Sequence, residues 1–332
     1  MGKKIIILGC GFGGLCTSNI LRKNLDRTHE IVVIDRKDSF MMGFTNLWVL
    51  EGRRTLEDSQ FPLNKLNSKG IKFIHDVVTE IDVKSKLVKT LNHDIPFRYD
   101  FLVIALGAEM TTDPISGFKE SNGFNLYDGE SIPALRNKIL SLEKGRIAIT
   151  IMGFPYKCPP APYESAFIID RMLRNNNNTN KSRREKIELD VYFPSNMPLP
   201  VAGKQPNQEL LSLLRKQNIN LFPDFLLGKV DKRFLYFKNK QKKEYDILIG
   251  IPLHFLPHVI SNSGLMDKKE DSWLTVDKFT LKTKFEDVFA IGDSTEIKID
   301  KLVSIPKAGI FAEGQAHSVA YQIINNINKD SK

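Results

Sequence analysis

The stretch IIILGCGFGG, residues 5–14, decides the fold of this 332-residue chain. Its apolar half predicts a buried strand, and its second half spaces three glycines as GxGxxG, namely Gly9, Gly11 and Gly14. Residues 15–25 then predict a helix, and EIVVID (30–35) predicts a second strand. Strand, glycine turn, helix and strand in this order predict a βαβ unit with a parallel sheet.

This glycine turn predicts a dinucleotide site. The first glycine makes a tight turn, the second lets the backbone approach a pyrophosphate, and the third lets helix and strand pack closely. The helix N-terminus then faces the phosphates. Asp35, 21 residues past Gly14, ends the second strand and suits a ribose hydroxyl. The candidate cofactor-binding residues here are Gly9, Gly11, Phe12, Gly14, Asp35 and Arg36.

Two later strands are expected to end beside the same site. DFLVIALGA (100–108) predicts a parallel strand, and DVFAIGD (287–293) predicts a buried strand that ends in a glycine and a carboxylate. A carboxylate in that place, followed by a helix, suits the ribityl and pyrophosphate groups of FAD. Because this element returns to the first domain, that domain is expected to be discontinuous. The candidate residues added are Ala105, Gly107, Gly292 and Asp293.

The middle of the chain predicts a second Rossmann-like unit. Its expected elements are helices at 131–144, after Cys158 and at 207–219, strands at 146–153, 187–193 and 246–251, and a hairpin at 232–245. We therefore expect an α/β protein with two Rossmann-like dinucleotide-binding domains. Residues 1–114 and 272–332 would form the FAD-binding domain, and residues 115–271 a degenerate NAD-type domain.

Other segments carry simpler predictions. Residues 39–54 are expected to be a loop, 71–91 an antiparallel β-meander, and 306–327 one long helix. The polar run at 175–186 is expected to be a loop. Two basic clusters, KSRREK (181–186) and KNKQKK (238–243), are interpreted as solvated loops or hairpin tips.

Composition limits the function classes. The chain is 42% hydrophobic and 26% charged, so it can bury a core. Its formal net charge of +9 comes with no nucleic-acid-binding motif, which leaves weak attraction to an anionic membrane surface. Three cysteines favour a reducing compartment, and no signal peptide or membrane span is evident. We expect a cytoplasmic protein and leave open peripheral attachment to the inner face of a membrane.

The motifs together resemble a known group. GCGFGG with Asp35, FLVIALGA and VFAIGD resemble the two-dinucleotide-binding-domain flavoproteins, the glutathione-reductase-like group. Four further stretches are similar to sulfide:quinone oxidoreductases and to the flavoprotein subunit of flavocytochrome c sulfide dehydrogenase: NLWV (46–49), CPPAPYE (158–164), DILIGIPLHFLPHVI (246–260) and PKAG (306–309). The resemblance implies an FAD enzyme that oxidises sulfide or a small thiol and reduces a quinone.

The second unit lacks its own GxGxxG. The corresponding stretch is IMGFPYKCPP (151–160), with one glycine, bulky residues and prolines. A backbone of this kind cannot approach a pyrophosphate, so NAD(P)H is disfavoured. The CxxxxC pair of disulfide reductases is also missing from the first domain.

Cys158 is the only cysteine beyond Cys16. A helix is expected to start at Ala161 or Pro162, and its dipole together with Lys157 favours the thiolate. The resemblance implies that this thiol faces the flavin and attacks or carries sulfide sulfur; an inert buried thiol is the alternative. The resemblance also suggests Glu164 as proton acceptor, although it could only complement the helix dipole.

The resemblance implies roles for other residues. His254 and His258 would lie near the active site, unless they are ordinary core or surface histidines. Lys307 would approach the pyrimidine edge of the flavin, unless it is solvated. Trp48 would line the ring or quinone site, or be a core residue. Cys10 and Cys16 are interpreted as packing residues, and no metal site is predicted.

Two departures from the pattern leave alternatives open. A second redox cysteine and C-terminal amphipathic helices are expected of sulfide:quinone oxidoreductases, but neither is seen before Lys332. The loop FMMGFTN (40–46) has no cysteine to tether a flavin, so FAD is expected to be non-covalent. The alternatives are an NAD(P)H-dependent flavin or quinone reductase and a non-catalytic flavin-binding partner protein. The electron acceptor, the sulfur product and a homo-oligomeric state stay open.

Overall fold

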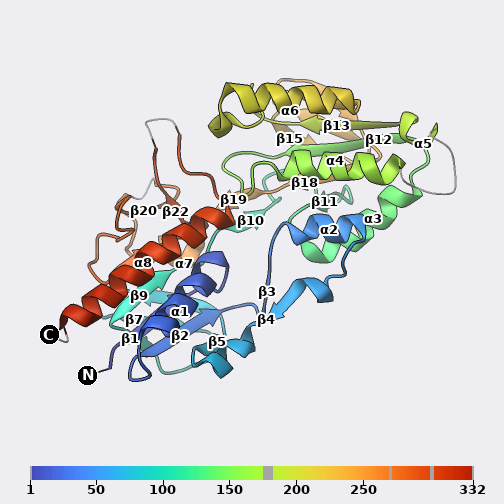
Figure 1. Cartoon of the computed structure of the whole chain (residues 1–332). Helices are drawn as coiled ribbons and strands as arrows, with labels where there is room; N and C mark the ends of the chain where they lie inside the picture. Colours follow the sequence, from blue (N-terminus) through green and yellow to red (C-terminus); the bar gives the residue numbers. More distant parts are fainter. Residues whose placement is uncertain (1, 175–181, 269–270, 300–302, 331–332) are drawn as a thin grey trace. The chain divides into compact units, whose positions relative to one another are not determined.

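The computed structural model describes residues 2–174, 182–268, 271–299 and 303–330, and Figure 1 shows its elements. The chain divides into two compact units. The first unit comprises residues 1–40, 61–109 and 255–332, and the second comprises residues 41–60 and 110–254. The first unit is discontinuous, and both are α/β, as predicted.

The boundaries of the units differ from the predicted ones in three places: residues 41–60 and 110–114 group with the second unit, and residues 255–271 group with the first. Residues 41–60 group with the second unit because they contain a helix, α2 (Thr45–Glu51), whose Leu47 and Leu50 lie in the core of that unit. The prediction of a loop over 39–54 was therefore wrong. Residues 255–271 group with the first unit because Leu256 and Ile260, around α7 (His258–Ser261), pack in its core.

The first unit is built on a five-stranded parallel sheet. Its strand order is β21 (Val288–Ala290), β9 (Phe101–Ile104), β1 (Lys4–Leu8), β2 (Glu30–Asp35) and β5 (Lys72–His75). Continuous Ile, Leu and Val runs suit such strands because both faces are covered. Ile5 and Ile7 pack in one core cluster, and Ile6 and Leu8 pack in another on the opposite face.

Helices α1 (Phe12–Asn24) and α8 (Gly309–Asp330) supply much of the first cluster, through residues such as Leu21, Ala316 and Ile323. The second cluster includes the antiparallel strands β6 (Val78–Asp82) and β7 (Leu87–Thr90), which pair with β8 (Phe97–Arg98). The predicted meander over 71–91 was therefore correct only from β6 onward, because β5 instead joins the parallel sheet beside β2.

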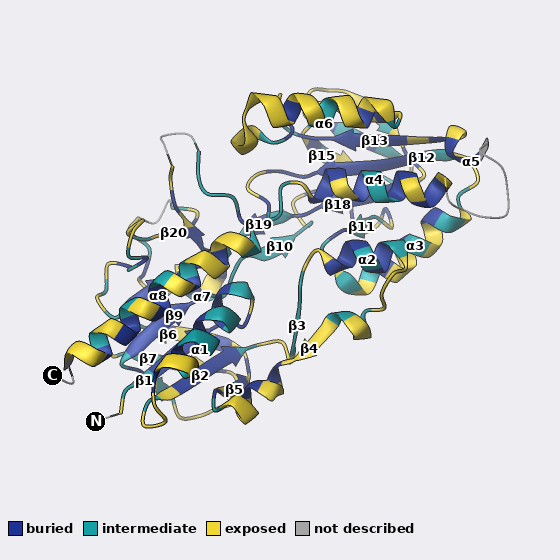
Figure 2. Cartoon of the chain, viewed as in Figure 1, coloured by how far each residue is buried: buried dark blue, intermediate teal, exposed yellow. Residues whose placement is uncertain are grey.

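The second unit has its own parallel sheet and a small antiparallel one. The parallel order is β11 (Phe124–Asn125), β18 (Ile247–Ile251), β12 (Gly145–Ile151), β13 (Ile187–Tyr192) and β14 (Ile219–Phe222). Its helices include α3 (Ile132–Ser141), α4 (Ala161–Arg174) and α6 (Lys204–Lys216). Figure 2 shows α6 as largely exposed and the strands beside it as buried. The antiparallel sheet contains β15 (Leu227–Val230), β16 (Phe234–Phe237) and β17 (Lys242–Glu244).

Four short strands lie at the points where the chain passes between the units: β3 (Ser39–Met41), β4 (Gln60–Pro62), β10 (Glu109–Thr111) and β19 (Leu253–Phe255). The first unit also contains β20 (Leu274–Thr275) and β22 (Thr295–Glu296), which pair in parallel. Among the described helices, none is both long and apolar enough to cross a bilayer.

The basic cluster at 181–186 is not solvated as predicted. Its described part includes α5 (Ser182–Glu185), where Arg183 and Arg184 are both buried. The Arg183 guanidinium donates to the carbonyl oxygens of Ile139, Leu140 and Leu142 and so caps the end of α3. Arg184 pairs with buried Asp170 on α4, with 2.6 Å between Nε and Oδ1. The rest of the predicted polar loop, residues 175–181, lies outside the described residues.

We expect Arg184→Ala to lower the free energy of unfolding by about 3–5 kcal/mol, because Asp170 loses its buried partner and three carbonyl oxygens, those of Ile187, Gln217 and Asn218, each lose a donor. The matched control is Arg174→Ala, since Arg174 also pairs with Asp170 but its side chain is 44% exposed. That change should cost no more than about 1 kcal/mol. Urea unfolding of both variants checks this, and equal losses would contradict it.

Candidate functional site

The predicted cofactor residues gather at the carboxyl ends of four strands in the first unit. Gly9 follows β1, Asp35 ends β2, Ala105 follows β9, and Gly292 lies just beyond β21. These strands are adjacent and parallel, so their carboxyl ends share one edge of the sheet. That edge is where open α/β sheets bind ligands.

The three glycines of the turn have different reasons for being glycine. A Cβ on Gly14 would lie 1.9 Å from the Gly9 carbonyl oxygen, and a Cβ on Gly9 would lie 2.3 Å from the Ala105 carbonyl oxygen. Gly9 also has φ +91°. A Cβ on Gly11 would meet nothing within 4 Å, and no side chain caps α1 there. The uncapped first turn therefore opens onto space that suits a pyrophosphate.

Side chains around the turn fix its shape. Asp35 accepts the backbone N–H of Cys10 on Oδ2 at 2.5 Å and that of Lys37 on Oδ1 at 2.8 Å. Asp35 thus holds the glycine turn, and its contact with a ribose stays a prediction. Phe12 packs edge-on against Phe40, with 5.3 Å between ring centroids. Arg36 is exposed and pairs with Glu109 at 3.3 Å.

The other strand ends are tied to one another and to α8. Ser294 donates from Oγ to the carbonyl oxygen of Gly107 at 2.8 Å, which links the loops after β21 and β9. Gly292 has φ +71° and donates its N–H to Oε1 of Gln315 on α8 at 2.6 Å. Asp293 and Lys307 line one pocket with Gly292 and the first turn of α8.

Lys307 is buried, which rules out the solvated lysine that the sequence left open. Its ammonium donates to the carbonyl oxygens of Asp293 at 2.6 Å and Thr295 at 3.1 Å, and it lies 3.4 Å from the ring centroid of Trp273. Burial lowers the pKa of Lys307 to about 8, although Asp293 and Glu296 oppose this shift. The Lys307 ammonium is therefore held in a desolvated environment beside the carboxyl end of β21.

This pKa sets a pH dependence of stability. Between about pH 8 and pH 10.5 the unfolded chain holds the Lys307 proton and the folded chain does not, so stability rises with pH over that window. The rise should reach about 3 kcal/mol. We expect Lys307→Met to remove it, as measured by chemical unfolding across this range. A wild type and a variant with parallel pH profiles would contradict the assignment.

Cys158 lies in the second unit, in the loop between β12 and α4. Residues 152–160 form this loop, and α4 begins at Ala161, as predicted. Cys158 is partly buried and has φ +54°, a left-handed conformation that side chains other than glycine rarely adopt. Its carbonyl oxygen accepts the N–H of Ala161 at 2.9 Å. The thiol is therefore placed directly before the first turn of α4.

Two side chains hold the peptide units on either side of Lys157. His254, which is buried, accepts the Lys157 N–H on Nε2 at 3.4 Å, and its Nδ1 lies 3.0 Å from the Pro252 carbonyl oxygen. Tyr127 donates from its hydroxyl to the Lys157 carbonyl oxygen at 2.6 Å. The Tyr127 and His254 rings also meet edge-on at 5.8 Å. This pattern fits a neutral His254 that carries its proton on Nδ1.

Two titratable side chains, Tyr156 and Glu164, lie within six residues of Cys158. Burial, with a contribution from Cys158, raises the pKa of the Tyr156 hydroxyl, which donates to the Pro159 carbonyl oxygen at 3.1 Å. Glu164 lies in the first turn of α4. Its side chain reaches solvent, yet the protein around it desolvates the carboxyl and raises its pKa. A raised pKa makes the Glu164 carboxylate a better proton acceptor than an ordinary glutamate carboxylate.

The predicted residues are divided between the two units. Cys158, Glu164 and His254 belong to the second unit, whereas His258 lies exposed at the start of α7 in the first. Trp48 lies on α2 and packs edge-on against Phe44 at 5.1 Å. Sequence reasoning missed Tyr127 because it comes from a loop 31 residues before Cys158, and only the fold brings the two together.

Comparison with known proteins agrees with this architecture. Residues 3–151 match the pyridine nucleotide-disulphide oxidoreductase family, and residues 133–184 match the central part of the sulfide dehydrogenase (flavocytochrome c) flavoprotein chain. The second match spans Cys158 and α4.

Individual proteins are also similar to this chain in sequence. The chain is 28% identical over 309 residues to the mitochondrial sulfide:quinone oxidoreductase of Dictyostelium discoideum, covering 90% of this chain and 66% of that one. It thus spans about two thirds of that relative. A type II NADH:quinone oxidoreductase of Staphylococcus haemolyticus is 36% identical over 122 residues, covering 36% of this chain and 29% of that one.

The fold also resembles a solved structure. The sulfide:quinone oxidoreductase from Aquifex aeolicus superposes with a TM-score of 0.86 at 21% identity, covering 99% of this chain and 78% of that one. This confirms the predicted fold class. The chain is therefore similar over most of its length to sulfide:quinone oxidoreductases, and its first 151 residues match the pyridine nucleotide-disulphide oxidoreductase family.

Proposed function

We propose that this enzyme oxidises sulfide or a related small thiol through Cys158 and passes the electrons via FAD to a quinone. The observation that carries the proposal is the loop between β12 and α4. In a nucleotide-binding unit this loop is short and glycine-rich, so that the backbone meets a pyrophosphate. Here a partly buried cysteine, preceded by a lysine and followed by two prolines, takes that place.

The FAD site is proposed in the first unit. The turn from Gly9 to Gly14 would hold the pyrophosphate, Asp35 would keep the turn in shape, and Lys307 would complement negative charge on the cofactor. FAD supplies a two-electron acceptor when it is bound. With no cysteine among residues 40–46, we propose that its binding is non-covalent.

The sulfur step would need a two-electron oxidant, which bound FAD would supply. The Cys158 thiolate and hydrosulfide would form one S–S bond, which would leave Cys158 as a persulfide. The hydrosulfide proton would pass to Glu164. The helix dipole of α4 and the charge of Lys157 favour the thiolate that this step needs.

We assign His254 a positioning role rather than that of a base, because Nε2 already accepts a backbone N–H and Nδ1 faces a carbonyl oxygen. His254→Ala should lower the rate of flavin reduction by sulfide about tenfold, which corresponds to one lost hydrogen bond. His254→Gln should restore most of the rate, because an amide can accept and donate in the same two directions. Stopped-flow reduction checks both variants.

The same experiment separates positioning from acid–base catalysis. A positioning residue leaves the shape of the pH–rate profile unchanged, whereas loss of a general base removes one of its limbs. A profile that loses a limb in both His254 variants would contradict the positioning role.

The identity of the electron donor distinguishes the proposed sulfide oxidation from the main alternative, an NADH-dependent reaction. The local similarity to a type II NADH:quinone oxidoreductase favours NADH as a second candidate. Under anaerobic conditions we expect sulfide, but neither NADH nor NADPH, to bleach the yellow protein, and a soluble ubiquinone analogue to restore the colour. Bleaching by NADH alone would favour the alternative. A flavin that stays oxidised with every donor would favour a non-catalytic flavin-binding protein.

The location follows as part of the proposal. A quinone acceptor is dissolved in a membrane, and a net charge of +9 favours contact with an anionic surface. We therefore propose peripheral attachment to the inner face of a membrane.

A further inference from the structure

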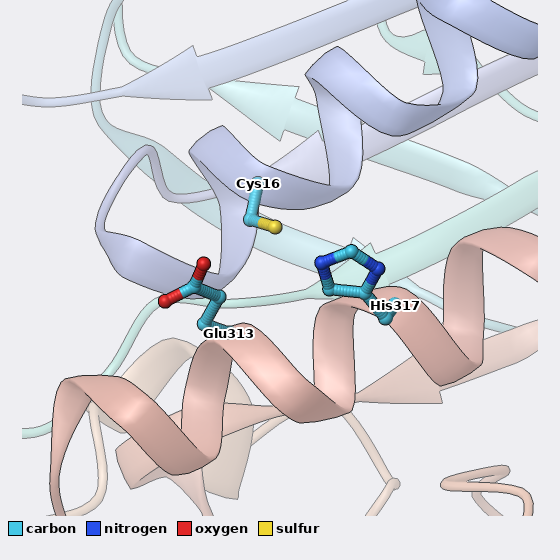
Figure 3. A group of neighbouring side chains, drawn as sticks. All are labelled: Cys16, Glu313 and His317. Carbon is cyan, nitrogen blue, oxygen red and sulfur yellow. The ribbon is translucent and has the colours of Figure 1, made fainter.

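A cluster of metal-ligating side chains lies between two helices of the first unit, apart from the glycine turn. Cys16 projects from α1, and Glu313 and His317 project from α8 (Figure 3). One ligand atom from each residue lies within 4.8 Å of the other two. Figure 3 shows the sulfur pointing into the space between the carboxylate and the imidazole.

The fold holds these three residues in register. Glu313 and His317 are four residues apart on α8, so they lie on the same side of that helix. Helices α1 and α8 pack against each other through a core that includes Leu21, Ala316 and Ala320. A rigid interface of this kind supports a metal site better than a loop does.

We propose that Cys16, Glu313 and His317 form a binding site for Zn²⁺. Thiolate, imidazole and carboxylate are the ligands that zinc takes in proteins, and three protein ligands with one water is a common tetrahedral set. Zinc needs ligand distances of about 2.0–2.3 Å, so the three atoms must approach one another by side-chain rotation. The sulfur ligand makes Mg²⁺ or Ca²⁺ a poor fit.

The surroundings of the cluster are consistent with a cation. Cys16 is partly buried, while Glu313 and His317 are exposed, so an ion can enter from solvent. Burial and the nearby Glu313 carboxylate raise the pKa of the Cys16 thiol. Within the described ranges, none of the three side chains makes an ion pair with a basic residue that could take the place of the ion.

The consequence of binding would be a link between two helices that flank the candidate cofactor site. Helix α1 follows the glycine turn at Gly11, and α8 begins at Gly309, where a Cβ would lie 2.8 Å from the Phe12 ring. An ion that binds the folded unit more tightly than the unfolded chain stabilises it. Zinc is therefore expected to raise the unfolding temperature of the flavin-loaded protein.

The test uses flavin-loaded protein that carries Cys158→Ser, because the Cys158 thiol and its neighbours could bind zinc themselves. Equilibrium dialysis with elemental analysis should find one Zn²⁺ per chain. Co²⁺ should give d–d bands in the red, beyond the flavin absorption. Cys16→Ser and His317→Gln should each weaken binding by more than the roughly 10- to 100-fold that loss of an outer-shell partner costs. Glu313→Gln should weaken it less.

A control variant outside the cluster and a check that every variant is folded accompany the zinc-binding measurement. His75→Gln changes a histidine of the same unit that is not in the cluster and should leave zinc binding unchanged. Flavin content and metal-free unfolding temperature should be equal in all variants, and zinc should raise that temperature only where Cys16 and His317 are both present. No stoichiometric binding, or equal affinity in Cys16→Ser, would overturn the proposal, whichever donor reduces the flavin.

Discussion

Cys158→Ser is expected to slow the anaerobic bleaching of the flavin by sulfide by at least about a thousandfold, because loss of a nucleophile removes the covalent path itself. A serine hydroxyl has nearly the same shape as the thiol but is neither ionised near neutral pH nor able to form an S–S bond. Stopped-flow absorbance of the oxidised flavin band, with sulfide in excess, measures the change.

The control for Cys158→Ser is a reductant that needs no thiol. Dithionite should bleach the wild type and the variant at the same rate, and both should carry the same amount of FAD. If sulfide bleached the variant as fast as the wild type, Cys158 would have no part in the reaction, and the proposed function would lose its central residue.

Gly11→Ala is expected to lower FAD affinity by at least about a hundredfold while the apoprotein stays folded. The reason is the geometry of Gly11: its φ of −75° is open to alanine, and the added Cβ meets no protein atom within 4 Å. The methyl group would instead occupy the space before α1 that the pyrophosphate is proposed to use. Alanine at a helix N-cap costs about 1 kcal/mol or less relative to glycine.

FAD titration followed by flavin fluorescence, together with thermal unfolding of the apoprotein, measures both effects. Gly314→Ala is the matched control, since its Cβ also meets nothing within 4 Å but lies on α8. It should leave FAD affinity unchanged and add up to about 1 kcal/mol of stability through better helix propensity. Unchanged FAD affinity in Gly11→Ala would move the cofactor site away from this turn.

The parts that sequence could predict are those set by local pattern. The spacing of Gly9, Gly11 and Gly14 after an apolar run predicted β1, the turn and α1, and the structure confirms that arrangement. The start of α4 at Ala161 was also predicted, because prolines mark the first turn of a helix.

The parts that sequence could not predict depend on distant contacts. Arg184 is part of a basic run, and only its pairing with Asp170 on another helix shows that it is buried. Glu313 and His317 have a recognisable spacing, but nothing local indicates that Cys16 lies beside them. Tyr127 and His254 likewise meet Lys157 through the fold alone. In each case the burial or the role of a polar residue depends on a partner that is distant along the chain.

The measurement that tests the central claim most directly follows sulfur onto Cys158. Flavin-loaded wild-type protein is mixed with one equivalent of sulfide in the absence of oxygen, and is then alkylated and digested. The mass of the peptide that contains Cys158 is measured by mass spectrometry. We predict bleached flavin and a Cys158 peptide heavier by one sulfur atom. A flavin that stays yellow, or one that bleaches while Cys158 carries no added sulfur, would contradict the account.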